Sequence, residues 1–213
     1  MKILVVSNCK GGVGKTTVAS NLANEFRLLG HVTVMVDMDS QYNLTKIYQS
    51  IANGNPTIVD VLNGKCTVDD ACVEVRENLY LIPGEEEIKN LGLKKSSKLL
   101  DSLLRNSEEL QEGGVEFVII DTPPGMSEAV KMAYAAADSV LLVTDPEKFA
   151  AENMSQRFQE VADIQQTLNS SISVLGIVII RLDGRRKLAK KTAKKLRATF
   201  GNHVFATHLS NET

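Results

Sequence analysis

Eight consecutive residues near the amino terminus, Lys10 to Thr17, carry the groups that phosphate binding requires. Glycines let backbone N–H groups approach a phosphate closely, a lysine can reach the β and γ phosphates, and a threonine hydroxyl can ligate Mg²⁺. We therefore predict that this loop binds ATP or ADP together with Mg²⁺. The predicted nucleotide ligands are Gly11, Gly12, Val13, Gly14, Lys15, Thr16 and Thr17, and Thr16 is also a predicted metal ligand.

The segments on either side of this loop support the prediction. The apolar run ILVVS at 3 to 7 precedes the loop, and the helical pattern VASNLANEFRLLG follows it. Strand, glycine loop and helix form the setting in which a helix N-terminus favours a phosphate. The alternative is a glycine turn that only connects two elements, and eight matching residues in this setting argue against it. Cys9 occupies a position where the general pattern has glycine, and we expect it to be a small buried residue rather than a reactive thiol.

Three aspartates at the ends of apolar runs are candidate acids. Asp37 and Asp39 end the run that begins at 32, and Asp121 ends the run VEFVIID at 115 to 121. A carboxylate at the carboxyl end of a strand faces the crevice where open α/β sheets bind ligands. Asp121 has the position of a Walker B acid, which holds Mg²⁺ directly or through water. The alternatives are helix capping for Asp37 and Asp39, and a buried strand terminus for Asp121.

The elements that must position these residues follow from hydrophobic periodicity. Short runs rich in Val and Ile, without polar alternation, are typical of parallel strands covered on both faces. Their alternation with helical patterns predicts βαβ units and an α/β fold, a doubly wound, mostly parallel sheet with helices on both faces. The expected strands are 3 to 7, 32 to 37, 79 to 82, 115 to 121, 139 to 145 and 173 to 180, and the expected helices are 15 to 29, 85 to 111, 126 to 137, 148 to 169 and 185 to 200.

Length and composition are those of a single domain spanning residues 1 to 213. The chain has 213 residues with 43% hydrophobic content, enough for one substantial core. No apolar run approaches the roughly 20 residues that span a bilayer, and nothing N-terminal resembles a signal peptide. The three cysteines form no CxxC pair. We expect a reducing compartment, the cytoplasm.

Charge is distributed unevenly although the formal net charge is only -2. Residues 181 to 213 hold nine Lys or Arg against two acids, which suggests a polyanionic partner. On a helix the lysines would share one face, while Leu188, Thr192, Ala193 and Leu196 would dock on the sheet. A solvated surface helix is the alternative. We predict non-specific DNA binding by Arg185, Arg186, Lys187, Lys190, Lys191, Lys194 and Lys195.

The loop with Lys10 before its glycines, the segment VDMDSQ at 36 to 41 and the segment IIDTPPG at 119 to 125 resemble the ParA and MinD family of deviant Walker A ATPases. This resemblance implies a P-loop NTPase fold. It also implies that Lys10 reaches the partner's phosphates in an ATP-bound homodimer and that Asp39 positions the attacking water. Asp37 would support the metal shell, and the N–H of Gly125 would sense the γ phosphate. The predicted catalytic residues are Lys10, Lys15 and Asp39, and the predicted metal residues are Thr16, Asp37 and Asp121.

Adenine contacts are harder to assign, because relatives often have asparagine near 180 and this chain has Ile180. Loops after the fifth and sixth expected strands could supply the walls of the adenine site. The candidates are Asp145, Pro146, Arg181 and Asp183.

Among the branches of the family, the chain is most similar to ParA-type partition ATPases. It lacks the cysteines of the iron-protein and scaffold branches. ParA-type relatives usually continue past 203 to 206 with a final helix, which we expect this chain to lack. We expect a slow, dimerising ATPase associated with the nucleoid that segregates plasmid or chromosomal DNA, is stimulated by a ParB-like or other small protein, and has no membrane partner. The alternatives are a MinD-like spatial regulator and a metabolic P-loop ligase or kinase.

Overall fold

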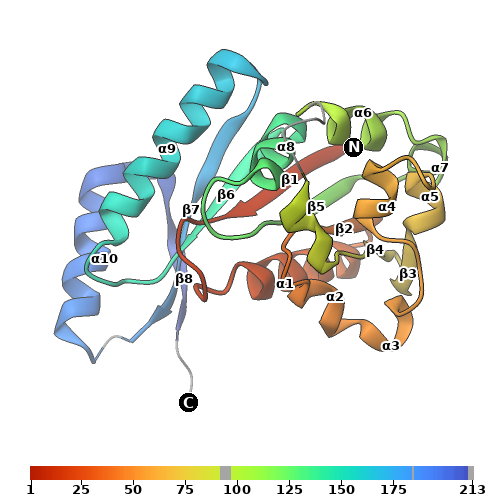
Figure 1. The fold of residues 1–213 in the computed structure, drawn as a ribbon. Helices are drawn as coiled ribbons and strands as arrows, with labels where there is room; N and C mark the ends of the chain where they lie inside the picture. Colours follow the sequence, from red (N-terminus) through yellow and green to blue (C-terminus); the bar gives the residue numbers. More distant parts are fainter. Residues whose placement is uncertain (92–96, 184, 211–213) are drawn as a thin grey trace.

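A single twisted sheet organises the chain in the computed structural model, which describes residues 1–91, 97–183 and 185–210. Its strand order is β3-β4-β2-β5-β1-β6-β7-β8, and every neighbouring pair is parallel except β3 and β4 (Figure 1). The predicted doubly wound α/β fold is therefore confirmed. The strands are β1 Lys2–Ser7, β2 Thr33–Asp37, β3 Val73–Arg76, β4 Leu79–Ile82, β5 Phe117–Asp121, β6 Ser139–Thr144, β7 Ser173–Leu182 and β8 Val204–Ser210.

Parallel pairing gathers the carboxyl ends of the central strands at one edge of the sheet. β5 lies between β1 and β2, so Asp121 is the register partner of both Val6 and Asp37. On the other side of β1, Ser7 pairs with Leu142 of β6. Loops that leave these strands therefore start side by side, as the position of ligand sites in open α/β sheets requires.

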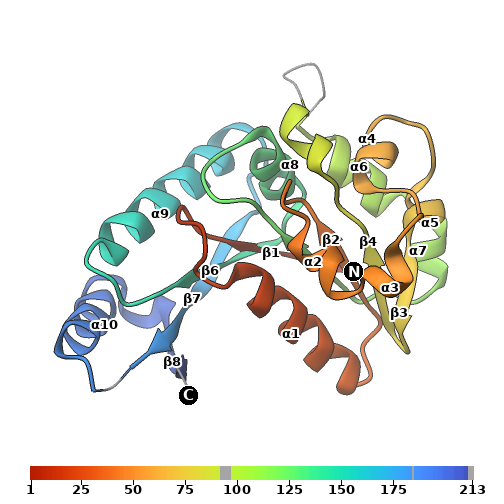
Figure 2. The ribbon, with the colours of Figure 1, turned by 60° about the horizontal axis from the view of Figure 1, so that its bottom comes forward.

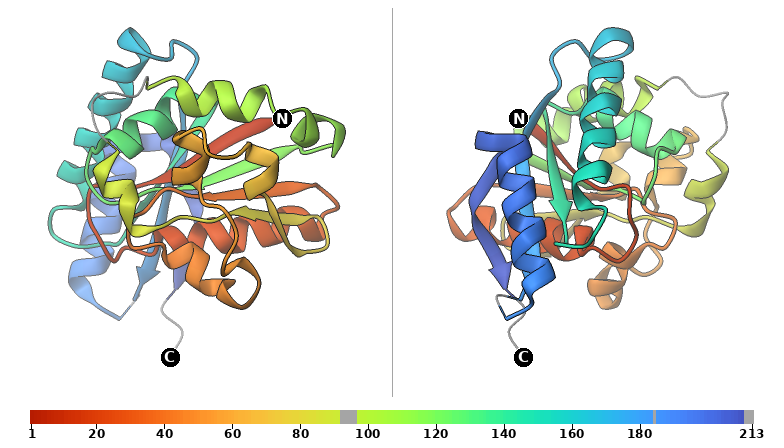
Figure 3. Two further views of the ribbon diagram at one scale, coloured as in Figure 1. Left: turned by 45° about the vertical axis from the view of Figure 1, so that its right-hand side comes forward. Right: turned by 90° about the vertical axis from the view of Figure 1, so that its left-hand side faces the viewer.

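Helices cover both faces of the sheet (Figures 1 and 2). One face carries α1 Lys15–Leu28, α2 Asn43–Ile47 and α3 Gln49–Ala52. The other face carries a larger group, with α9 and α10 side by side over the β6 to β8 end (Figure 3). That group consists of α4 Ile58–Leu62, α5 Val68–Ala71, α6 Leu99–Arg105, α7 Glu108–Glu112, α8 Glu128–Ala136, α9 Ala150–Thr167 and α10 Lys187–Phe200.

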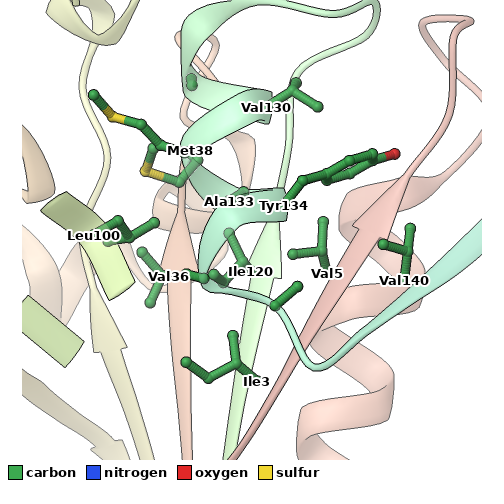
Figure 4. Packing of buried hydrophobic residues seen from close by; sticks show 14 of the residues in the cluster. Ile3, Val5, Val36, Met38, Leu100, Ile120, Val130, Ala133, Tyr134 and Val140 are labelled. Carbon is green, nitrogen blue, oxygen red and sulfur yellow. The ribbon is translucent and has the colours of Figure 1, made fainter. Parts of the chain in front are cut away.

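Alternate residues of each central strand supply two hydrophobic cores. Ile3 and Val5 pack under the larger helix group, whereas Leu4 and Val6 pack against α1. Figure 4 shows the larger core, where Val36 and Ile120 lie beneath the helix that carries Tyr134. Because both faces are buried, the strands are apolar throughout, which is the reason the sequence pattern identified them.

The predicted helix at 85 to 111 is wrong. The structure has a 3-10 helix at Glu86–Asn90, followed by α6 and α7 as separate helices, while residues 92–96 lie outside the described chain. α7 starts anew because the Ser107 hydroxyl caps it by accepting the N–H of Leu110. The region from 42 to 78 forms four short helices and β3, an antiparallel edge strand that the pattern missed. Asn78, with φ of 60°, makes the tight turn into β4.

Across the described residues, every helix is too short or too polar to cross a membrane.

Candidate nucleotide-binding site

The predicted phosphate loop connects β1 to the N-terminus of α1. Gly12 and Gly14 have φ of 72° and 81°, backbone conformations that favour glycine. A side chain on Gly14 would also collide with Ile180, since its Cβ would lie 2.7 Å from Ile180 Cδ1. No side chain caps the first turn of α1, and that turn contains no acid. Its N–H groups and positive dipole end therefore face the loop, as an anion site requires.

Lys15 and Thr16, the first residues of α1, lie beside the acid that ends β5. Lys15 is 6% exposed, and burial lowers its pKa while Asp121 and Asp39 raise it. The Thr16 hydroxyl donates to Asp121 Oδ2 at 2.6 Å. The other oxygen, Asp121 Oδ1, is buried without a hydrogen-bond partner. A buried carboxylate oxygen without a partner, next to a hydroxyl, is the oxygen donor set that Mg²⁺ prefers.

Burial raises the pKa of Asp121 to about 7, and the nearby Asp37 carboxylate contributes to the rise. The Thr16 hydroxyl and the Lys15 ammonium act in the opposite direction. The carboxylate is thus held in a site that disfavours its charge until a cation arrives, which is a further sign that this group fits a metal.

Both carboxylate oxygens of Asp37, for which a role in the metal shell stays a prediction, accept hydrogen bonds within the protein. Its Oδ2 accepts both the N–H and the hydroxyl of Thr45 at 2.8 Å, and its Oδ1 accepts the N–H of Asp39 at 3.1 Å. These bonds fix the start of α2 and the turn after β2, although burial still raises the pKa of Asp37 to about 6. Its hydrogen bonds make Asp37 the organiser of this turn. Asp39 is 7% exposed and accepts the N–H of Gln41.

Lys10 extends from the loop toward the segment after β6. Its Nζ lies 2.6 Å from Glu147 Oε2 and 3.4 Å from Asp145 Oδ2. Lys10 is partly exposed and Glu147 is exposed, so their pair is a weak surface contact, whereas Asp145 is mostly buried and lies at the longer distance.

A cavity of about 320 Å³ lies beside the loop and contains three of the four predicted adenine walls, Asp145, Pro146 and Arg181. Arg181 has φ of 53° and donates from Nη1 to the carbonyl of Gly12 at 2.7 Å. Asp183 is absent from the lining and instead accepts the Arg185 N–H and Nε–H. The remaining lining residues, which the sequence did not single out for this role, are Glu147, Lys148, Arg186, Leu188 and Ala189.

α10 carries the predicted basic face. Its lysines at 187, 190, 191, 194 and 195 are all exposed, and Lys195 Nζ lies 2.8 Å from Glu152 Oε1 of α9. The predicted docking role of Leu188 is wrong, since Leu188 is 51% exposed. Thr192, Ala193 and Leu196 are buried as predicted, and Ala189 takes the place of Leu188, because these four residues form the i, i+3, i+4, i+7 stripe of this helix.

Sequence reasoning missed Arg157. This side chain of α9 is 0% exposed, and its Nη2 donates to the carbonyl of Gly125 at 2.7 Å. A signal was present, since Arg157 takes a place in the stripe of buried residues of α9, between Met154 and Val161. A cation within an apolar stripe identifies a buried charge that requires partners.

Comparison with known proteins agrees with this geometry. Residues 1–174 match the family model described as AAA domain. Over 209 residues the chain is 34% identical to the chromosome-partitioning ATPase Soj of Treponema pallidum, covering 97% of this chain and 81% of that protein. It is 31% identical over 214 residues to the chromosome partitioning protein ParA of Caulobacter vibrioides, covering 96% and 79%.

Among solved structures, cobyrinic acid a,c-diamide synthase from Mycobacterium smegmatis with bound ADP and magnesium superposes with a TM-score of 0.89 at 24% identity, covering 100% of this chain and 87% of that one. At that identity the match shows the fold alone. The family match, the identity to Soj and ParA, and the phosphate loop lead to one conclusion: the chain belongs to the ParA/Soj family of P-loop ATPases.

Proposed function

We propose that this chain is a partition ATPase that binds ATP and Mg²⁺ in the described loop, dimerises in the ATP state and then binds DNA without sequence preference. The observation that carries the nucleotide part is the hydrogen bond from Thr16 to Asp121 Oδ2, with Asp121 Oδ1 left without a partner beside Lys15. The names of the relatives, chromosome partitioning proteins, support the biological role.

Each group of the site has a proposed task. Lys15 and the loop N–H groups bind the phosphates, and Thr16 with Asp121 holds Mg²⁺, which when bound offsets the negative charge of the phosphates. Asp39 orients the attacking water and accepts a proton from it. The cavity lined by Asp145, Pro146 and Arg181 receives adenine.

Lys10 has its proposed role in the dimer, where it reaches the phosphates bound by the partner subunit. Its weak contacts with Asp145 and Glu147 in the single chain leave it free to exchange partners at little cost. We further propose that a small ParB-like protein stimulates hydrolysis and that the ATP-bound dimer resides on the nucleoid in the cytoplasm.

The exposed lysines of α10 support the DNA part of the proposal. Like charges at i, i+4 destabilise a helix by a few tenths of a kcal/mol per pair, and a phosphate backbone would relieve that cost. A dimer presents two such faces, so binding should be much tighter with ATP than without it. Binding should also weaken steeply with added salt, because each phosphate contact releases counterions.

The test uses random-sequence duplex DNA, with binding measured by fluorescence polarisation with and without ATP and Mg²⁺ over a salt series. Replacing Lys190, Lys191, Lys194 and Lys195 with Gln should abolish DNA binding and leave ATP affinity unchanged. Replacing Lys2, Lys65, Lys89 and Lys131 with Gln changes the net charge equally and should leave DNA binding nearly intact. Equal losses in both variants, or no salt-sensitive binding by the wild type, would refute the DNA proposal and favour the alternative of a MinD-like spatial regulator that acts on a protein partner.

The role of Asp39 has its own test. Asp39→Ala should still bind ATP and accumulate as the ATP-bound dimer, while turnover falls by about 10²-fold, the scale of losing a positioned base. Phosphate release and light scattering measure the two effects. Normal turnover in this variant would move the catalytic role to another residue.

A further inference from the structure

Behind the phosphate loop lies a buried polar cluster that the proposed chemistry does not use. It centres on Arg157 of α9, whose Nη2 donates to the Gly125 carbonyl and whose Nη1 lies 2.7 Å from Glu160 Oε2. Tyr134, also 0% exposed, donates its hydroxyl to Ser7 at the end of β1, and Figure 4 shows it on the helix above the core. Cys9 Sγ, at the start of the loop, contacts the Asn153 carbonyl of α9 at 3.4 Å.

This placement of Arg157 is costly. Taking a guanidinium out of water costs several kcal/mol, and Arg157 cannot release its proton to avoid that cost. Glu160 supplies one counter-charge, yet Arg157 Nε has no hydrogen-bond partner. The apolar residues Met154 and Val161 occupy the same buried stripe of α9, so packing alone would be satisfied by a hydrophobic side chain. The contacts that Arg157 makes must therefore explain why the protein buries a charged side chain at this position.

Arg157 contacts the segment of residues 122 to 127, which borders the end of the nucleotide site that contains Asp121 and Gly11. It begins directly after Asp121, which is bonded to Thr16, and Pro124 packs beside Gly11 of the phosphate loop. The adenine cavity lies elsewhere, along the segment after β6. Since lysine and threonine of such a loop serve the β and γ phosphates and the metal, this segment flanks the terminal phosphate.

We propose that Arg157 is a positioning residue that fixes the 122 to 127 segment through the Gly125 carbonyl, so that this segment distinguishes ATP from ADP. Gly125 has φ of 81°, a conformation that glycine adopts easily and also leaves easily. A hydrogen bond from another element is therefore needed as a tie that holds the backbone of this segment in one conformation. A hydrogen bond from a charged donor inside the protein is strong enough to serve as that tie.

The inference rests on the proposed nucleotide site, and its test compares ADP with the non-hydrolysable ATP analogue AMPPNP by calorimetry. The main variant is Arg157→Met with Glu160→Gln, which removes the tie without leaving a lone buried charge. AMPPNP affinity should fall by about tenfold, the loss of one charged hydrogen bond, while ADP affinity stays within about twofold. Glu160→Gln alone keeps the tie and should retain the preference for AMPPNP.

Two further variants separate a specific effect on nucleotide preference from a general loss of folding. Arg157→Lys keeps the charge but replaces two separated guanidinium nitrogens with one ammonium on a shorter side chain, which cannot occupy both the Nη1 and the Nη2 positions, so the AMPPNP preference should again fall. Gln159→Met changes an exposed residue of the same helix and should alter neither affinity. Equal weakening of ADP and AMPPNP, or an unchanged preference in the Arg157 variants, would overturn the inference. A wild-type protein that binds neither nucleotide would instead refute the proposed function itself.

Discussion

At the scale of single residues, Lys15 is the cation on which nucleotide binding should depend. It is buried beside Asp121 and Asp39 at the first turn of α1, where it is the cation that the phosphates would meet. Lys15→Ala should therefore reduce ATP affinity below detection in calorimetry. Lys2→Ala removes an exposed lysine at the opposite end of β1 and serves as the matched control. Retention of ATP affinity by Lys15→Ala would contradict the proposed site.

Asp121 gives the nucleotide-free protein a specific dependence of stability on pH. Its ordinary pKa is 3.8 and its folded-state pKa is about 7, so between these values the folded state binds more protons than the unfolded state. Stability must then fall as pH rises through this window, and the penalty is complete above about pH 7. Asp121→Asn cannot ionise, so it should be more stable than wild type at pH 8.5, by roughly 1 to 4 kcal/mol.

Urea unfolding at pH 5.0 and pH 8.5 measures this difference. The stability gain of Asp121→Asn over wild type should be larger at pH 8.5 than at pH 5.0. A gain that is equal at the two pH values, or a loss at pH 8.5, would show that the buried carboxylate is not penalised in the free protein.

At the scale of elements, α10 shows how one helix combines a structural face with a charged face. Leu196 is 0% exposed and packs in the larger core, whereas Leu188 on the same helix is 51% exposed. Leu196→Ala should therefore destabilise the protein by about 2 to 5 kcal/mol, and Leu188→Ala by no more than about 0.5 kcal/mol. Chemical unfolding of the two variants provides the measurement, with each as the control for the other. Similar losses would mean that α10 packs with a different face.

The short helices α4 and α5 are specified by their N-caps and their packing, whereas the long helices of this chain are specified by hydrophobic periodicity. α4 and α5 are only four or five residues long, and each starts with a capping box, Thr57 with Asp60 and Thr67 with Asp70. Such short helices have too few residues for a hydrophobic period, so their caps and their packing determine them. This is the reason the region from 42 to 78 could not be read from apolar spacing.

At the scale of the whole molecule, the proposed ATP-bound dimer depends on Lys10. Its contacts in the single chain are an exposed ion pair with Glu147 and a longer one with Asp145, both weak, so Lys10→Ala should fold normally and still bind ATP. It should remain a monomer in light scattering with ATP and Mg²⁺, whereas the wild type should dimerise. Glu147→Gln breaks the Lys10 contact but keeps the lysine, and it should still dimerise. An ATP-bound dimer of Lys10→Ala would remove the cross-subunit role.

The sequence alone determined the phosphate loop, the strands β1, β2, β4, β5, β6 and β7, and the acids that end β2 and β5. These features are local. Hydrophobic runs follow from burial on both faces, and the loop needs a fixed order of glycine, lysine and threonine within a few residues. Any protein that packs such strands in parallel brings their carboxyl ends to one edge of the sheet, so the sequence placed Asp121 and the loop at the same edge. The pairing of β1 with β5, which makes them neighbours, was decided by the tertiary structure.

The tertiary structure alone decided how side chains far apart in the chain are used. Asp37 is held by Thr45, Lys195 pairs with Glu152, and Arg157 reaches Gly125 across 32 positions. No local pattern specifies such pairs, because each depends on the angle at which two helices or loops pack over the sheet. That packing decides whether a charged side chain is solvated, paired or buried, and therefore which role the side chain can have in the site.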